Sequence, residues 1–215
     1  MTRGGVKKEV QMTVRPRPEA LQAFLDAVQR GFGAASPGAE TKACLARVFE
    51  RLEHPVASTV PTPERVPATV FLGKALGAAR ASGGATSELA DALADLDSAL
   101  FWRARGGPEG GADLSRPGSI ANAMVVGPNG IEDRKDVWVG ISLVPPGVRY
   151  PEHRHSPEEI YLFLTDGRFR HGESGWFSPG IGGTLYNEPN ILHSMESPAT
   201  APLLAIWCLF DERHA

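Results

Sequence analysis

Two histidines spaced two residues apart and followed by a glutamate constrain the fold of this chain more than any other feature. They are His153, His155 and Glu159, and a further histidine, His193, follows later. Alternate residues of a β-strand point to the same face, so His153 and His155 would face one side together. Imidazole and carboxylate are ligand types that suit zinc, iron, manganese or nickel. The pattern predicts a metal site on the inside of a small β-barrel.

The composition argues against several classes of protein. With 215 residues, of which 42% are hydrophobic and 22% charged, the chain has the balance of one globular domain with a sizeable core. A net charge of −3 without a basic run argues against nucleic acid or a membrane surface as partner. No apolar stretch follows the polar residues 1–12, so we expect no signal peptide and no membrane span, and a cytoplasmic location. Cys44 and Cys208 are expected to be buried small hydrophobic residues rather than a disulfide.

The hydrophobic pattern changes near residue 105. Before it, apolar residues recur at intervals of three and four, which predicts amphipathic helices. One stripe runs from Leu21 to Phe32, a second covers 39–52, a short helix covers 70–79, and another begins at Thr86 as N-cap. The predicted first region, 1–105, is therefore helical and packs on the barrel.

The second region, 106–215, has the pattern of a β-protein. A stretch rich in glycine and proline, 105–118, predicts a linker or long loop. Short apolar runs with period two then predict strands at 123–126, 137–144, 160–164, 182–186 and 203–210, with Asn129-Gly130 marking a hairpin after the first. The predicted fold class is mainly β, a sandwich or barrel preceded by the helical region.

The histidine block resembles the two motifs of the cupins, small jelly-roll β-barrels that hold one metal ion. The first motif reads Gly147-x5-His153-x-His155-x3-Glu159-x7-Gly167, one residue longer than the family pattern before its last glycine. The second reads Gly183-x5-Pro189-x3-His193 and departs further, because the family's glycine between proline and histidine is missing. That stretch is also one residue shorter than in the family. The resemblance implies a cupin jelly-roll barrel over 106–215.

A finer pattern resembles the bacterial dimethylsulfoniopropionate (DMSP) lyases, whose motif reads Tyr-x2-His-x-His-x3-Glu-x-Tyr before a later histidine. The matching residues are Tyr150, His153, His155, Glu159, Tyr161 and His193. The helical first region is similar to the extension that those enzymes place before their barrel. Carried over, the resemblance implies His155, Glu159, Tyr161 and His193 as metal ligands and Tyr150 as a second essential tyrosine. His153 would be a ligand in a generic cupin, whereas the lyase resemblance leaves it in the pocket near metal or substrate.

The implied activity is β-elimination of DMSP, a zwitterion with a carboxylate and a dimethylsulfonium, to dimethyl sulfide and acrylate. A proton must leave the carbon next to the carboxylate, and one divalent transition metal ion (zinc, iron, manganese or nickel) would stabilise the developing charge. Tyrosine has an unperturbed pKa of about 10, so it acts as a base near neutral pH only where its phenolate is stabilised. Either tyrosine can be the base. We favour Tyr161, with Tyr150 orienting substrate or sharing the proton transfer and His153 close by.

Aromatic faces would hold the sulfonium end through cation–π attraction. Trp207 is the first candidate, followed by Trp138 and Phe163, and a place in the core explains each of them equally well. His171 lies in a turn-like segment and is expected at the surface rather than as a ligand.

Three alternatives stay open. One is an iron dioxygenase of a small acid or thiol that uses the three histidines and Glu159 and leaves the tyrosines incidental. Another is a cupin that binds a metabolite without catalysis, against which the intact ligand set argues. The third is a lyase-like cupin that acts on another small carboxylic acid, because fold and metal do not fix the substrate. A small molecule is the expected partner, and a homodimer through the helical face is compatible with the pattern.

Overall fold

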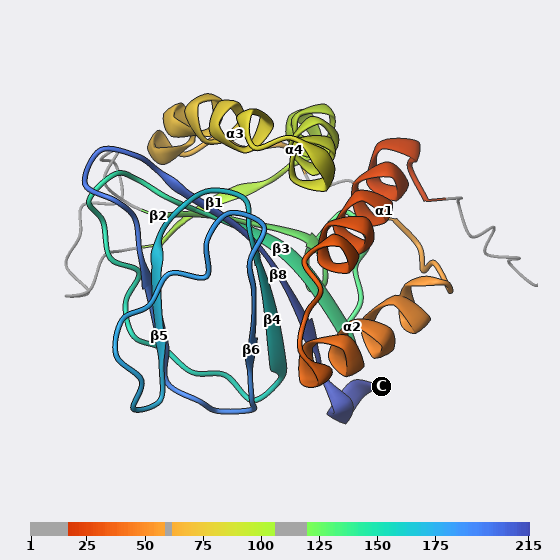
Figure 1. Ribbon diagram of the computed structural model, residues 1–215. Coiled ribbons are helices and arrows are strands. Elements are labelled where there is room, and N and C mark those ends of the chain that lie inside the picture. The colour runs from red at the N-terminus through yellow and green to blue at the C-terminus, as the bar shows by residue number, and fades with distance from the viewer. Residues whose placement is uncertain (1–16, 59–61, 106–119) are drawn as a thin grey trace, which may run out of the picture.

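In the computed structural model, which describes residues 17–58, 62–105 and 120–215, eight strands form two antiparallel sheets that face each other (Figure 1). The larger sheet has the order β1 (Trp102–Arg105), β2 (Ile120–Val126), β3 (Val137–Val144), β8 (Leu203–Phe210), β4 (Glu158–Phe163), β6 (Thr184–Asn187). The smaller sheet pairs β5 (Arg168–His171) with β7 (His193–Glu196). The second half of the chain thus folds as a β-sandwich of the cupin type, as predicted.

Alternation along the central strands gives the large sheet two different faces. On β4, Ile160 and Leu162 join the core beneath the helices, whereas Tyr161 and Phe163 belong to a second cluster between the sheets. The same division holds on β8, where Ile206 faces the helices. Both faces of these strands are covered, which explains their nearly continuous apolar sequence. The face between the sheets carries the second cluster, with Tyr150 and Tyr161 in it.

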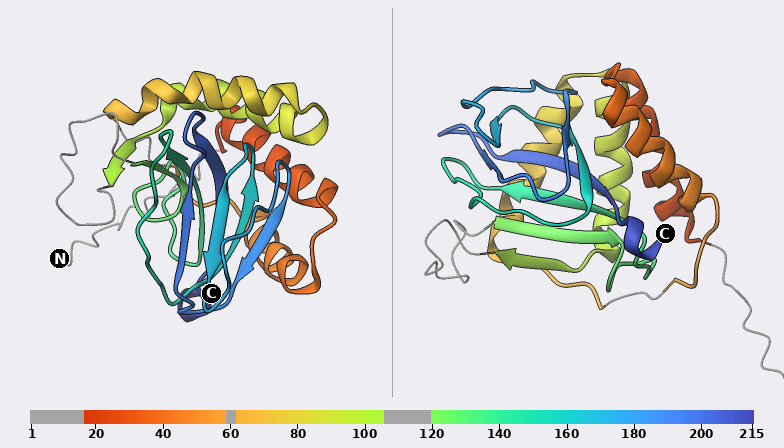
Figure 2. Two further views of the ribbon diagram at one scale, coloured as in Figure 1. Left: turned by 60° about the vertical axis from the view of Figure 1, so that its left-hand side comes forward. Right: turned by 90° about the horizontal axis from the view of Figure 1, so that it is seen from below.

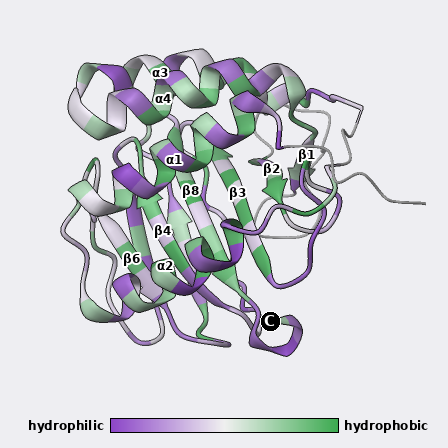
Figure 3. Ribbon diagram, turned by 90° about the vertical axis from the view of Figure 1, so that its right-hand side faces the viewer, coloured by the Kyte–Doolittle hydropathy of each residue, from purple (hydrophilic) through white to green (hydrophobic). Residues whose placement is uncertain are grey.

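Four α-helices cover the outer face of the large sheet (Figures 1 and 2). They are α1 (Glu19–Ala34), α2 (Ala39–Leu52), α3 (Leu72–Ala81) and α4 (Gly84–Leu96), with short 3-10 turns at Pro67–Phe71, Asp97–Ala99 and Glu212–His214. Their apolar stripes are buried, and the strands beneath them are largely hydrophobic (Figure 3). At Gly31 of α1, an added Cβ would lie 2.7 Å from Leu162 Cδ2, so glycine lets this helix approach β4 closely. None of the described helices is both long and apolar enough to cross a bilayer.

Several local predictions need correction. Helix α4 begins at Gly84 after Gly83 rather than at Thr86, and no side chain caps it. Strands β1, β5 and β7 were not predicted, and Arg105, expected to begin the linker, is the last residue of β1. The rest of that linker and residues 1–16 and 59–61 lie outside the described part of the chain. The division at residue 105 stays a prediction, and one continuous hydrophobic core spans it. Cys44 and Cys208 are buried and free, as predicted.

A buried ion cluster ties the segment before α1 to the connection between β2 and β3. Glu132, whose side chain is fully buried, accepts hydrogen bonds from Arg17 Nε at 2.7 Å and from Arg134 Nη1 at 3.0 Å. Arg17 also donates to the carbonyl oxygen of Leu52 at the end of α2, at 2.8 Å. Arg134 in turn holds Asp136 through two hydrogen bonds. This cluster fixes helices α1 and α2 against the sheet.

Replacing Glu132 by alanine should destabilise the fold strongly. The change leaves two buried guanidinium groups without their shared carboxylate, which costs about 3–5 kcal/mol of unfolding free energy. Urea unfolding followed by circular dichroism measures this loss. Glu88→Ala is the matched control, because the Arg30–Glu88 pair has side chains 57% and 59% exposed and its loss should cost at most about 1 kcal/mol. Equal losses in the two variants would contradict the structural role given to Glu132.

Candidate active site

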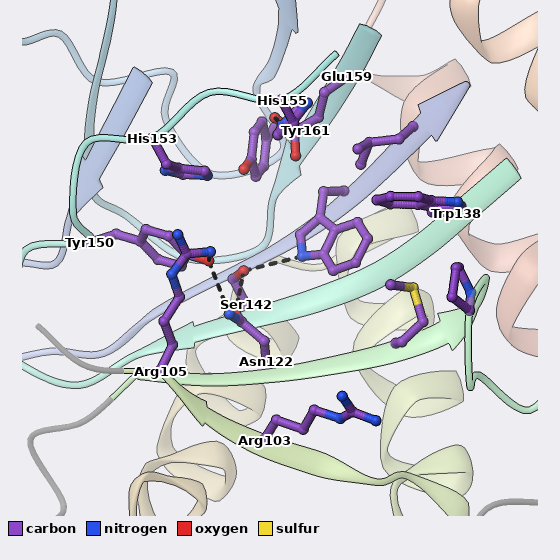
Figure 4. Close-up of a pocket in the computed structure, with 14 residues that line it drawn as sticks. Arg103, Arg105, Asn122, Trp138, Ser142, Tyr150, His153, His155, Glu159 and Tyr161 are labelled. Atoms are coloured by element: carbon purple, nitrogen blue, oxygen red, sulfur yellow. Dashed lines mark hydrogen bonds and ion pairs between the residues drawn. The ribbon is translucent and has the colours of Figure 1, made fainter. Parts of the chain in front are cut away.

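A cavity of about 250 Å³ opens on the inner face of the large sheet (Figure 4). Its residues come from β1, β2, β3, β4 and β8 and from the segment before β4. One part of the wall is polar, with Arg105, Asn122 and Tyr150, and another is apolar, with Met124 and Trp138. The residues that the histidine motif singled out form a third part of the same wall: His153, His155, Glu159 and Tyr161.

The three predicted histidines converge. One ring nitrogen from each of His153, His155 and His193 lies within 4.8 Å of the others. The pairing of the segment before β4 with β7 produces this convergence, because the backbones of His153 and His193 exchange two hydrogen bonds of 3.0 Å. His193 is 1% exposed and stands behind the cavity wall. The predicted grouping of the histidines in the barrel is therefore present.

In all three rings Nδ1 is taken by the backbone, so Nε2 is the nitrogen that could bind a cation. Each Nδ1 lies within hydrogen-bond distance of a backbone carbonyl oxygen. The distances are 2.9 Å for His153, 3.0 Å for His155 and 3.0 Å for His193. A carbonyl oxygen only accepts, so each Nδ1 carries the hydrogen and each neutral ring presents its lone pair at Nε2. Nε2 of His193 is buried with no hydrogen-bond partner among the described residues. An unsatisfied buried nitrogen of this kind fits a metal ligand.

Glu159 completes this cluster. Its Oε2 lies 3.2 Å from Nε2 of His155, 3.2 Å from Nε2 of His193, and accepts a 3.2 Å hydrogen bond from Asn187 Nδ2. The His193 contact has the distance of an ion pair without hydrogen-bond geometry. Lone pairs on the two imidazoles would repel the carboxylate unless a proton or a metal cation lay between them. The donor set and its geometry therefore fit a cation.

The titration behaviour of the cluster agrees with this picture. Burial alone would raise the pKa of Glu159, but its contacts with the imidazoles of His155 and His193 lower it to about 2. Burial and the neighbouring His193 lower the pKa of His153 to about 4, so this ring is neutral at physiological pH. Burial opposes the charging of His155, yet its bond to Glu159 raises its pKa. The two opposite shifts thus favour a positive charge, a proton or a metal ion, between the buried carboxylate and its imidazole neighbours.

The two tyrosines lie near this cluster, but their neighbours have opposite effects on the charge that each can carry. Tyr161 is 2% exposed and follows Glu159 on the same strand face; burial and the Glu159 charge raise its pKa well above the usual value. The Oη of Tyr150 accepts hydrogen bonds from Arg105 Nη1 at 3.0 Å and from Asn122 Nδ2 at 2.9 Å. Burial raises the pKa of Tyr150, and Arg105 and Asn122 oppose that rise. Negative charge on Tyr161 therefore needs a nearby cation.

Two of the three predicted aromatic contacts line the cavity. Trp207 lies across Gly140 of β3, and its Nε1 donates to Ser142 Oγ at 3.1 Å. Trp138 also lines the cavity, with its Nε1 donating to the carbonyl oxygen of Lys135 at 3.0 Å. Phe163 is not among the lining residues: it is 1% exposed and stacks against Tyr161 with ring centroids 5.8 Å apart. The two tryptophans are therefore placed to contact a substrate in the cavity, and Phe163 is not.

Several residues of the site were missed from the sequence. Asn122, Ser142 and Asn187 are single polar residues on buried strands, and that exception to an apolar pattern is the signal that could have found them. His171, expected at the surface, is half-buried on β5, and its Nδ1 lies 3.1 Å from Asn187 Oδ1. Nothing in the sequence indicated that Arg105 belongs to the site, because it adjoins a glycine-rich segment that is typical of a linker.

Fold and site together define a cupin barrel with a histidine–carboxylate cluster inside it. A family model described as dimethylsulfoniopropionate lyase matches residues 40–205, and the chain belongs to that family. The resemblance seen in the tyrosine and histidine motif is thereby confirmed at the level of the family.

Individual relatives agree with the family. A protein of Cereibacter sphaeroides with the curated name "Putative dimethylsulfoniopropionate lyase DddL" is 28% identical over 154 residues, covering 70% of this chain and 63% of the relative. The chain thus spans less than two thirds of that relative's length.

Two solved structures have the same fold. The crystal structure of the DMSP lyase DddQ from Ruegeria pomeroyi has a TM-score of 0.69 at 21% identity, with 91% of this chain and 93% of that one covered. A chain from the crystal structures of the DMSP lyases RdDddP and RnDddQII has a TM-score of 0.65 at 19% identity, with 90% and 93% covered.

Replacing Gly140 by alanine should displace Trp207. The added Cβ would lie 2.1 Å from Trp207 Cζ2 and 2.7 Å from the carbonyl oxygen of Ala123, so the indole must leave its position and its bond to Ser142. We expect a loss of about 1–3 kcal/mol of unfolding free energy, typical of overpacking. Gly77→Ala, in α3 with no atom near the new Cβ, is the control and should not destabilise the protein. Thermal unfolding compares the two, and an unchanged Gly140→Ala protein would refute the close packing.

Proposed function

We propose that this protein is a metal-dependent lyase that cleaves dimethylsulfoniopropionate by β-elimination to dimethyl sulfide and acrylate. The observation that carries the proposal is the meeting of ring nitrogens from three histidines with the Glu159 carboxylate, beside a cavity that two tyrosines line. Family membership supports the same reaction class. The cavity also has a cationic and polar part and an apolar aromatic part, which suits a zwitterion with a carboxylate and a sulfonium.

The proposed metal ligands are His155, Glu159 and His193, with Tyr161 as the fourth and His153 within reach of the same site. Support comes from the convergent ring nitrogens and from Nε2 of His193, which is buried without a hydrogen-bond partner in the part of the chain that the structure describes. When bound, a divalent transition metal ion (zinc, iron, manganese or nickel) supplies Lewis-acid stabilisation of charge on the substrate carboxylate. Mixed nitrogen and oxygen ligands are compatible with all four metals.

Residues of the chain perform the proton transfer in this proposal. Tyr161 removes the proton next to the substrate carboxylate, the electron pair of that bond forms the new double bond, and the carbon–sulfur bond breaks as dimethyl sulfide leaves with its electrons. Tyr150 orients the substrate. Trp207 and Trp138 hold the sulfonium by their ring faces. Burial and the Glu159 charge raise the pKa of Tyr161, so in this proposal it acts as a base only when the metal is bound beside it.

Headspace detection of dimethyl sulfide from purified protein and DMSP tests the proposal. We expect release of dimethyl sulfide together with acrylate, its loss after treatment with a chelator, and its recovery when one of the four metals is added back. Oxygen uptake measured in the same samples should stay at background, because an elimination consumes none. Oxygen consumption without dimethyl sulfide would instead favour the dioxygenase alternative. No product from the metal-loaded protein would point to another small carboxylic acid.

Tyr161→Phe separates the roles of the two tyrosines. If Tyr161 is the base, its loss should abolish exchange of the substrate α-proton with solvent and lower kcat by at least about 100-fold, the size typical of a general base. Exchange is followed by NMR of DMSP in deuterated water. Tyr150→Phe is the matched control and should retain measurable exchange. Exchange at the wild-type rate in Tyr161→Phe would transfer the role of base to another group.

Asn187→Leu should weaken metal binding. Asn187 donates to the same oxygen of Glu159 that faces the two imidazoles, and loss of such an outer hydrogen bond lowers metal affinity by roughly 10- to 100-fold. Competition with a chromophoric chelator measures the affinity. Asn122→Leu is the matched control, because Asn122 contacts Tyr150 rather than Glu159. Equal affinities in both variants would show that Asn187 does not hold the metal ligand in place.

The remaining expectations are retained as proposals. We propose a location in the cytoplasm and a division of the chain at residue 105 into a helical and a β region. A homodimer would need a surface other than the apolar faces of α1 and α4, because those faces are buried against the rest of the chain.

A further inference from the structure

A series of hydrogen bonds runs from Trp207 to Tyr150 across three strands of the large sheet (Figure 4). Trp207 Nε1 on β8 donates to Ser142 Oγ on β3 at 3.1 Å, and Ser142 Oγ donates to Asn122 Oδ1 on β2 at 2.8 Å. Asn122 Nδ2 then donates to Tyr150 Oη at 2.9 Å. Arg105 on β1 adds a second donor at the same oxygen, at 3.0 Å. The histidine cluster takes no part in these bonds.

Trp207, the first residue in this series, determines which group donates and which accepts in each of the hydrogen bonds. An indole N–H only donates, so Ser142 Oγ must accept from Trp207. Ser142 is 2% exposed, and in the described part of the protein its hydroxyl hydrogen has one acceptor, the amide oxygen of Asn122. A flipped amide would leave that buried hydrogen unsatisfied. The NH2 group of Asn122 is therefore held toward Tyr150.

Two donors at the Tyr150 oxygen leave one direction for its own hydrogen. Arg105 carries only donors, and the amide of Asn122 presents its donor side, so neither can accept from Tyr150. In Figure 4 Asn122 lies below the hydroxyl, while Tyr161 and Glu159 lie above it across the cavity. The guanidinium of Arg105 also lies over the Tyr150 ring, 4.9 Å from its centroid, which fixes the ring as well as the oxygen.

We propose that Arg105 and Asn122 are positioning residues that hold the Tyr150 hydroxyl with its hydrogen directed into the cavity, and that Ser142 and Trp207 set the direction of this pair. The role in turnover rests on the proposed lyase function: Tyr150 presents its O–H to a carboxylate oxygen of the substrate, while the proton is removed elsewhere. Trp207 then contributes in two ways. Its ring lines the cavity, and its N–H orients Asn122 through Ser142.

The state of the Tyr150 oxygen can be measured without activity. The chain contains three tyrosines, so protein labelled with ¹³C at tyrosine Cζ gives three signals, which single Tyr→Phe variants assign. Asn122→Asp replaces the donor by an acceptor of the same shape, and Ser142→Ala releases the amide. Both should move the Tyr150 signal and leave that of Tyr186 in place. Asn190→Asp, which adds the same charge at an exposed turn, is the control and should move neither.

A double-mutant cycle tests the role in turnover. Asn122→Asp and Arg105→Met should each lower kcat at least about tenfold, the size of one hydrogen bond, with unchanged metal content and melting temperature. In the Tyr150→Phe background the same changes should alter kcat by less than about twofold, because their effect passes through the missing hydroxyl. Ser142→Ala, which removes a single oxygen, repeats the test with a milder change in case a charged variant folds poorly.

The outcomes separate the two proposals. A Tyr150 signal that stays unchanged in Asn122→Asp and Ser142→Ala overturns the positioning role, as does a full loss of kcat retained in the Tyr150→Phe background. If the wild-type protein releases no dimethyl sulfide while the Tyr150 signal still moves, the lyase function fails and the hydrogen-bonded arrangement stands.

Discussion

Repulsion between a buried carboxylate and the imidazole lone pairs around it governs the interior of this barrel. Glu159 is ionised and almost fully buried, and the Nε2 atoms of His155 and His193 face the same carboxylate oxygen. Backbone carbonyls fix each histidine Nδ1 as a donor, so the rings cannot turn their hydrogens inward while neutral. Only positive charge between these groups removes the repulsion. The pairing of β4 with β6 and the bridge between His153 and His193 hold the cluster in this arrangement.

Features that depend on local spacing could be predicted from the sequence. Strands β3 and β8 have their expected bounds, because each is a long apolar run buried on both faces. The histidines converge as their spacing indicated, since HxH places both rings on one side of an extended segment. Strands β1, β5 and β7 have only four residues each, and all three contain charged residues. Pairing with distant segments stabilises them, and local propensity gives little sign of it.

The face of the sheet on which a side chain lies could be predicted more easily than whether that side chain reaches the cavity. Phe163 shares its face with Tyr161, as period two requires, yet it lies beyond the cavity, in the apolar packing around Phe169. Periodicity gives the side of the sheet on which a residue lies, and the position along the strand at which the cavity ends depends on the opposite sheet. Arg105 reaches the site for a similar reason: pairing of β1 with β2 brings it beside Tyr150, which lies distant in sequence.

The two tyrosines at this cavity depend on different neighbours, and this difference divides their chemistry. The oxygen of Tyr150 faces a guanidinium and an amide donor. These two donors support either negative charge on the oxygen or a hydrogen directed into the cavity, without any metal. Tyr161 instead lies beside the Glu159 carboxylate, which opposes its ionisation. A cation bound to Glu159 would neutralise that charge and favour the phenolate. A positive charge in the histidine cluster would therefore act mainly on Tyr161, because Glu159 is a smaller cause of the raised pKa of Tyr150, whose oxygen keeps its two donors in both states.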